Sequence, residues 1–189
     1  THDYANYGIA GDWGAFAILG EIYYRNGGGR RDFNIEPPKS SVHRKNYGSD
    51  ELGDMNHIAP MVKMLWQLPT RRNMVFELKY AYEDNNYNQS YAGQTTTDFN
   101  ANPHQQYVGY QLGEFNTEHH TSYAKFRADI NDNITNTTTG YFNYFTRDWF
   151  KLDKVISGGT SCSLETVVSK AATGNCLAAL GILKGTTAG

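Results

Sequence analysis

Basic side chains suited to holding an anion gather between positions 26 and 56. They are Arg30, Arg31, Lys39, Arg44 and Lys45, set among glycines and prolines. The Arg guanidinium is a planar fork of hydrogen-bond donors that matches the two oxygens of a carboxylate. We therefore take Arg30, Arg31 and Arg44 as candidate contacts for an anionic ligand. The alternative is that these cations are solvated or contact phosphate groups at a surface.

A second candidate surface is aromatic and lies between positions 86 and 116. Its rings are Tyr87, Tyr91, Phe99, Tyr107, Tyr110 and Phe115, spaced among amide side chains. Tyr91, Tyr107 and Tyr110 are candidates for stacking on an aromatic or hydrophobic ligand. The same rings would equally serve to pack the segment upon itself, as happens in compact surface loops. The sequence leaves both interpretations open.

No arrangement of residues predicts catalysis. The chain has no Gly-x-Ser-x-Gly motif, no phosphate-binding loop and no His/Glu spacing typical of a zinc enzyme. His119 and His120 are neighbours, and neighbouring strand residues point to opposite faces, so we expect no metal pair there. We therefore expect neither an enzyme nor an intrinsic metal or cofactor.

The two cysteines, Cys162 and Cys176, lie in a stretch rich in Gly, Ser and Thr. A loop disulfide formed in an oxidising compartment fits their spacing, and the entropy model gives it ~3 kcal/mol. Two free thiols are the alternative.

Six strands are predicted from the alternation of apolar and polar residues. They are expected near residues 4–11, 15–25, 57–68, 74–84, 117–130 and 134–149. The connections at 12–14, 69–73 and 131–133 are brief and contain the Gly, Pro, Asn or Asp that tight reversals favour. The connections 26–56 and 86–116 are long, and 154–189 is expected to be a further loop or a tail, closed by a disulfide if the cysteines pair. Short turns at one end and long loops at the other are typical of outer-membrane β-barrels.

The faces and lengths of these strands favour an antiparallel transmembrane β-barrel. Along 74–84, Phe76 and Leu78 share one side, while Glu77 and Lys79 share the other. The strands run about 11–14 residues, against a globular mode of ~5–6, and a tilted membrane strand needs ~9–11. Pro60 cannot donate to a ladder, so we expect a bulge or an unpaired position there. A soluble β-sandwich also alternates, and it stays open as an alternative.

Composition narrows the remaining classes. A net charge of −2 argues against a nucleic-acid partner. The longest apolar run falls short of the ~18–20 residues that a membrane helix requires. The chain opens with Thr1 and has no visible signal peptide, so we expect a processed chain or an internal fragment. Six strands cannot close a membrane barrel, whose smallest members have about eight, so we expect a section of a larger barrel.

Two long runs carry a family resemblance. They are QSYAGQTTTDFNANPHQQY at 89–107 and TTTGYFNYFTRDWFKLD at 137–153, the second ending in an Arg-x-Trp-x-Lys-Leu-Asp pattern. With Asn116-Thr117-Glu118-His119 between them and the Gly-rich RNGGGRRDF at 25–33, they resemble TonB-dependent outer-membrane receptors, most closely the ferric citrate branch. The resemblance covers about residues 4–153 and leaves 154–189 unmatched. Gln105-Gln106 departs from the pattern, because relatives often carry an Arg just before the following Tyr.

The resemblance implies TonB-dependent uptake of a ferric chelate, of siderophore or ferric citrate type, across the bacterial outer membrane. It implies a 22-stranded barrel filled by an N-terminal plug, of which this chain would be a section of wall. The implied partners are the lipid bilayer, lipopolysaccharide, the iron chelate, and the TonB complex through a plug that we do not find in this chain. The alternatives are a passive porin-like barrel and a soluble secreted β-sandwich that binds carbohydrate.

Overall fold

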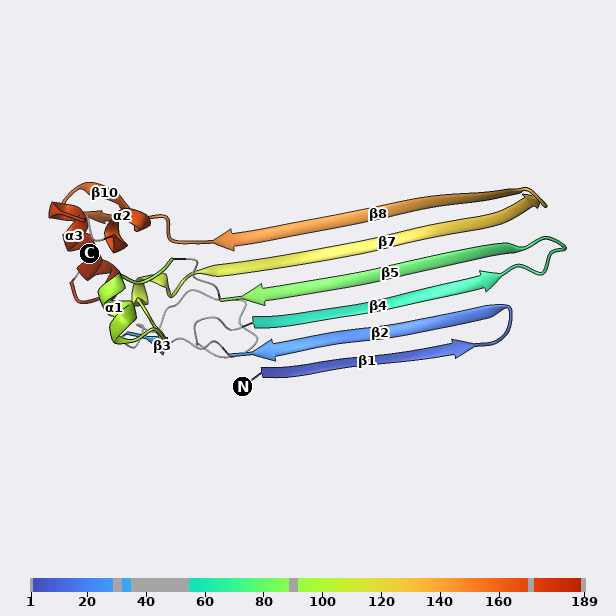
Figure 1. Ribbon diagram of the computed structural model, residues 1–189, viewed down its shortest axis with the longest axis horizontal. Helices are drawn as coiled ribbons and strands as arrows, with labels where there is room; N and C mark the ends of the chain where they lie inside the picture. Colours follow the sequence, from blue (N-terminus) through green and yellow to red (C-terminus); the bar gives the residue numbers. More distant parts are fainter. Residues whose placement is uncertain (1, 29–31, 35–54, 89–91, 170–171, 188–189) are drawn as a thin grey trace.

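A single antiparallel sheet of long strands dominates the computed structural model, which describes residues 2–28, 32–34, 55–88, 92–169 and 172–187 (Figure 1). Its members are β1 (His2–Asp12), β2 (Phe16–Gly27), β4 (Met55–Gln67), β5 (Met74–Tyr87), β7 (Glu114–Asn131) and β8 (Ile134–Phe150). Each strand pairs with the preceding strand of this sheet, in the order β1-β2-β4-β5-β7-β8. The antiparallel sheet and its strand positions confirm the prediction to within three residues at every end.

Tight reversals join the strands at one end of this sheet. Between β1 and β2, the amide of Trp13 donates to the carbonyl of Phe16 at 2.8 Å, and Gly14 takes a positive φ of 75°. At the β7–β8 turn, the amide of Asn133 donates to the side-chain oxygen of Asn131 at 2.9 Å. Both hydrogen bonds satisfy backbone amides at the points where the chain reverses. The three brief connections predicted from the sequence all lie at this end, on the right of Figure 1.

Pro60 interrupts one ladder without shifting it. Pro60 pairs with Ile22 of β2, but the pairing of β4 with β5 passes from Ile58↔Asp84 to Met61↔Ala81 and skips Ala59 and Pro60. The register is the same before and after the gap, so no residue is inserted. The expected disturbance is therefore a pair of unpaired positions rather than a bulge, because proline lacks the amide hydrogen that the ladder needs.

The sheet is a single open layer. Within the described chain no barrel closure is found, and β1 and β8 are the edges of the sheet. Of the described apolar side chains on its six strands, only Ala128 is buried. No helix in the described part of the chain is long and apolar enough to cross a membrane. The buried core of the molecule therefore lies elsewhere.

That core lies in a smaller unit at the loop end of the sheet, which we call the cap and define as residues 32–34, 92–113 and the described part of 154–187 (Figure 1). It contains β3 (Asp32–Phe33), α1 (Thr96–Ala101), β6 (Gln105–Gln106), η1 (Val108–Tyr110), β9 (Lys154–Ser157), β10 (Thr160–Ser163), α2 (Leu164–Val168) and α3 (Gly174–Lys184). Its core is made by Tyr107, Tyr110, Val155, Cys162, Leu164, Val167, Ala179 and Leu183.

The cap corrects the expectation that 154–189 is a loop or a tail. The segment forms a β9–β10 hairpin followed by α2 and α3, and it shares its core with Tyr107 and Tyr110 of the preceding connection. Residues 32–34 join the same unit, because β3 pairs in parallel with β6. The connections that leave β2, β5 and β8 thus all contribute to one folded body.

Candidate functional site on the charged face of the sheet

The large sheet separates charge onto one of its faces. Because side chains alternate along a strand, the register assigns each residue to a face. One face carries Glu21, Lys63, Glu77, Lys79, Lys125 and Arg127, and we call it the charged face. The opposite, apolar face carries, in one cross-strand row, Phe16, Trp66, Phe76 and Phe126.

Charged side chains on the apolar face are confined to its loop end. Among the described strand residues they are Asp3, Asp84, Glu114, Glu118 and Asp148, with His120 beside them. Below them, β5 presents only Met74, Phe76, Leu78, Tyr80 and Tyr82 to this face. Large side chains on it are open to solvent, and Ile9 and Trp66 are 69% and 50% exposed. An apolar surface this extensive is typical of a face that contacts a membrane or packs against another apolar surface.

The charged face is held by pairs between strands. Lys63 of β4 lies 3.2 Å from the carboxylate of Glu77 on β5, and the hydroxyl of Tyr123 on β7 donates to the same carboxylate at 2.6 Å. Nearer the loop end, the Nε2 of His57 lies 3.3 Å from the carboxylate of Glu83. The two contacts to Glu77 couple β4, β5 and β7 through one acceptor.

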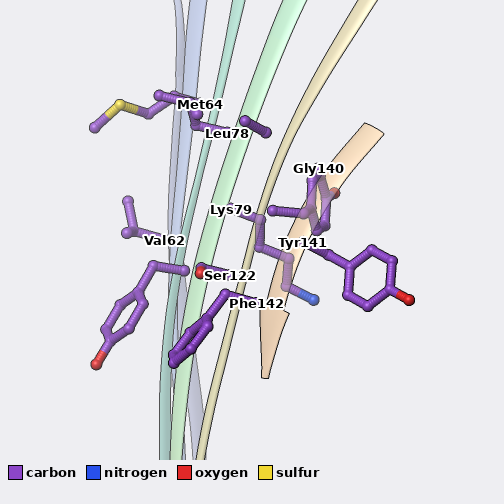
Figure 2. A pocket seen from close by; sticks show the side chains of 11 residues that line it. Val62, Met64, Leu78, Lys79, Ser122, Gly140, Tyr141 and Phe142 are labelled. Carbon is purple, nitrogen blue, oxygen red and sulfur yellow. The ribbon is translucent and has the colours of Figure 1, made fainter. Parts of the chain in front are cut away.

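Figure 2 shows the two faces at the level of a hollow of about 650 Å³. Val62, Met64 and Phe142 extend to one side of the ribbons, whereas Lys79 and Tyr141 extend to the other. The lining thus belongs to both faces of one sheet, so the hollow is no enclosed binding cavity. It marks the place where the small Ser122, Ala124 and Gly140 lie between larger neighbours.

An aromatic row crosses the charged face at its loop end. Met55, Tyr87, Phe115 and Trp149 are successive cross-strand partners on β4, β5, β7 and β8, and we call them the aromatic shelf. The ring centroids of Tyr87 and Phe115 are 6.4 Å apart. Those of Phe115 and Trp149 are 5.7 Å apart at an interplanar angle of 82°. Both pairs fall in the range in which aromatic rings attract one another.

Cations border the aromatic shelf. The next row of the charged face contains Arg25, His57 and Arg147. The guanidinium of Arg147 lies 5.8 Å from the centroid of the Trp149 ring, and the ammonium of Lys151 lies 4.8 Å from it. Within the part of the chain that the structure describes, Arg25 and Arg147 have no carboxylate partner. This row was not predicted from the sequence, although Arg147 and Trp149 belong to the motif that carries the family resemblance.

The candidate ligand residues from the sequence are distributed differently. Arg30, Arg31, Arg44 and Tyr91 lie outside the described residues. Tyr107 and Tyr110 are 1% and 2% exposed, and their ring centroids lie 6.0 Å apart inside the cap core. Their rings are used for packing, so they offer no surface on which a ligand could stack. The sequence allowed either ligand stacking or internal packing for this segment, and these two tyrosines are used for internal packing.

Tyr107 also takes part in a polar cluster around Asp98. Its hydroxyl donates to the Asp98 carboxylate at 2.5 Å, and the Thr95 hydroxyl donates to the same oxygen at 2.8 Å. The Lys184 ammonium donates at 2.9 Å. Burial raises the pKa of Asp98, but the hydrogen bonds from Lys184, Tyr107 and Thr95 outweigh it and hold that pKa below its usual range. The cluster ties α1 to α3 and is structural.

The cysteines and the neighbouring histidines singled out from the sequence have clear positions in the structure. Cys162 and Cys176 are joined by a disulfide that links β10 to α3. His119 pairs with Glu83 on the charged face, whereas His120 pairs with Tyr82 on the apolar face, so the two rings do not converge. Among the described residues there is no group of three or more His, Cys, Asp or Glu side chains suited to a metal ion.

No model of a known protein family matches the chain, and neither a curated protein nor a solved structure does.

Proposed function

We propose that this chain forms a section of the wall of a bacterial outer-membrane β-barrel that takes up a ferric chelate in a TonB-dependent manner. The apolar face would meet lipid, and the charged face would line the aqueous interior. The long connections and the cap would lie on the extracellular side. The observation that carries the proposal is the segregation of charge between the two faces, which the register places residue by residue.

The dimensions of the apolar face support this orientation. From Met74 to Tyr82, β5 spans roughly 27 Å at about 3.4 Å per residue. A strand tilt of about 40° reduces this to roughly 21 Å along the membrane normal, close to the apolar band of about 25 Å in known barrels. Aromatic rings border the band, with Phe16, Trp66, Phe76 and Phe126 on one side and Tyr24, Tyr82 and Tyr144 on the other. Such girdles are typical of membrane interfaces.

A soluble sandwich is the weaker explanation of the same sheet. In a sandwich, a second sheet covers the apolar face at a distance of about 10 Å. In the described chain, large side chains of that face such as Ile9, Trp66 and Phe142 remain open to solvent, and the core lies in the cap. A passive porin fits the two faces equally well, but it gives no account of the residues that resemble TonB-dependent receptors. We therefore prefer iron uptake to passive diffusion as the proposed function.

Labelling of alternate residues along β5 tests the placement in a membrane. Nitroxide labels at positions 76–81 of the protein in liposomes should alternate, with 76, 78 and 80 accessible to lipid-soluble oxygen and 77, 79 and 81 to a water-soluble relaxation agent. Equal access of the water-soluble agent to all positions would contradict the proposal that these strands form a wall in the membrane.

A second experiment tests transport. It measures uptake of radioactive iron supplied as a single chelate, in strains with and without the gene and with and without TonB. Uptake that needs the gene but not TonB would favour the porin.

A further inference from the structure

We propose that Lys63, Lys79 and Lys125 form a binding site for an oxyanion that carries more than one negative charge, such as a polycarboxylate or a condensed phosphate. The three residues, which we call the lysine cluster, lie on the neighbouring strands β4, β5 and β7 of the charged face. The proposal goes beyond the proposed function, because binding of an anion by this face requires neither iron nor TonB.

Two of the three lysines oppose each other directly. Lys63 and Lys79 are cross-strand partners in the pairing of β4 with β5. Like charges in directly opposed positions destabilise a sheet. On the charged face of the described sheet, no other pair of Lys, Arg, Asp or Glu side chains of like charge is directly opposed. An anion bound by both ammonium groups would replace this repulsion with attraction.

The cluster carries more positive charge than its neighbours balance. Glu77, the cross-strand partner of Lys125, lies 3.2 Å from the ammonium group of Lys63. In the described part of the chain, neither Lys79 nor Lys125 forms an ion pair with a carboxylate, and Glu21 of β2 pairs with none of the three lysines. One carboxylate therefore faces three ammonium groups, and the remaining field attracts anions.

The position of the two unpaired lysines strengthens this argument. The side chains of Lys79 and Lys125 are half-buried. A charge without a partner costs more solvation free energy in such a place than on an open surface. Each ammonium group is a compact charge with three donors, which suits the oxygens of a carboxylate or a phosphate.

A phenol in the same row limits the size of the ligand. Lys79, Tyr123 and Tyr141 follow one another across β5, β7 and β8. The hydroxyl of Tyr123 donates to Glu77, whereas Tyr141 is 79% exposed and extends to the same side of the sheet as Lys79 (Figure 2). Strands two places apart are separated by about 10 Å. An extended anion therefore reaches both Lys79 and Tyr141, and a monatomic anion does not.

Equilibrium dialysis of the protein in a neutral detergent tests the proposal. The probes are radioactive citrate and radioactive pyrophosphate, each at low and at high salt. Saturable binding is expected, and the probe that binds more tightly distinguishes a carboxylate ligand from a phosphate. Lys79→Gln should weaken this binding about tenfold and make it less dependent on salt. Lys79→Arg keeps the charge and should stay within about threefold of the wild type.

Glu77→Gln should have the opposite effect. It removes the carboxylate that competes for the cluster and keeps a side-chain oxygen that accepts from the hydroxyl of Tyr123. Binding of the probe should therefore become about threefold tighter. Lys154→Gln is the matched control, because Lys154 is an exposed lysine on β9 of the cap. It should bind both probes like the wild type.

Three results would overturn the proposal. They are the absence of saturable binding of both probes, unchanged binding in Lys79→Gln, and equal losses in Lys79→Gln and Lys154→Gln. In each case the lysines would be solvated residues of the charged face. None of these results bears on TonB-dependent uptake of iron, which the transport experiment tests separately.

Discussion

The ammonium group of Lys184 lies 2.9 Å from the carboxylate of Asp98, although the two residues are 86 positions apart. This ion pair connects the end of α3 to the first turn of α1. The same lysine contributes its backbone carbonyl, which accepts from the side-chain amide of Asn34 at 2.7 Å. The side-chain oxygen of Asn34 in turn accepts from the amide of Val108 at 2.8 Å. The C-terminal end of α3 therefore joins the connections that leave β2, β5 and β8.

Asp98 makes the cap sensitive to acid. Because its pKa in the folded protein lies below the ordinary value of 3.8, its contribution to stability is complete above that value and is lost as the pH falls through the folded pKa. Hydrogen exchange of the amides of Phe99 and Tyr110 should accelerate over this acid range. Asp98→Asn should abolish that dependence and destabilise the cap by about 1–2 kcal/mol at pH 7.

Asp132→Asn is the matched control for this experiment, because Asp132 lies exposed in the β7–β8 turn at the other end of the sheet. It should leave the exchange of both cap amides unchanged. An Asp98→Asn protein whose exchange still accelerates in acid would show that another group is responsible.

The disulfide stabilises the cap and not the sheet. Cys162 and Cys176 enclose a separation of 14 residues, for which the entropy model gives roughly 3 kcal/mol. Reduction should therefore expose α3 to proteolysis after Lys184 while leaving β4, β5 and β7 protected. In the double variant Cys162→Ser, Cys176→Ser, a reductant should have no further effect. Equal proteolysis of the wild type with and without reductant would contradict the prediction.

Gly109 is required because α3 approaches its backbone closely. A Cβ at this position would lie 2.7 Å from Cδ1 of Leu183 and 2.8 Å from its carbonyl oxygen. Gly109→Ala should therefore destabilise the cap by about 1–3 kcal/mol, since the backbone of α3 must move. Gly93→Ala, where a Cβ meets no atom within 4 Å, should be neutral. Chemical denaturation followed by protection of the cap amides separates the two outcomes.

The large sheet could be predicted from the sequence because its information is local. Period-two alternation along Met74–Tyr82 and the Asn-Asp-Asn turn at 131–133 fix strand, face and reversal within a few residues of one another. The effect of Pro60 was predictable for the same reason. The short turns then fix the neighbouring pairs β1–β2, β4–β5 and β7–β8.

The cap could not be predicted in this way, because its contacts are distant in sequence. Local signals were present: Thr95 and Asp98 form the [ST]-x-x-[DE] pattern of a helix N-terminus, and Gly185 ends α3 with a positive φ of 73°. They define two short helices, but they do not say that Lys184 meets Asp98 or that Asn34 meets Lys184. The burial of Tyr107 and Tyr110 depends on those contacts, so their role as core residues could not be separated from ligand binding in the sequence.

A charge placed on the apolar face distinguishes lipid from water most directly. Leu78 lies near the middle of the apolar stretch of β5, between Phe76 and Tyr80, and Ala81 lies on the charged face of the same strand. If the apolar face meets hydrocarbon, Leu78→Arg should destabilise the protein in a bilayer by about 2–4 kcal/mol, because an arginine at the midplane must be desolvated. Ala81→Arg adds the same charge among Lys63, Lys79 and Glu83, where water is available, so its cost should stay below about 1 kcal/mol. Reversible unfolding from liposomes in denaturant measures both values.

The comparison is decisive because both variants gain the same side chain on the same strand and differ only in the face on which it lies. Equal costs in the two variants would mean that the apolar face does not meet lipid, and the assignment of the charged face to an aqueous interior would be lost with it.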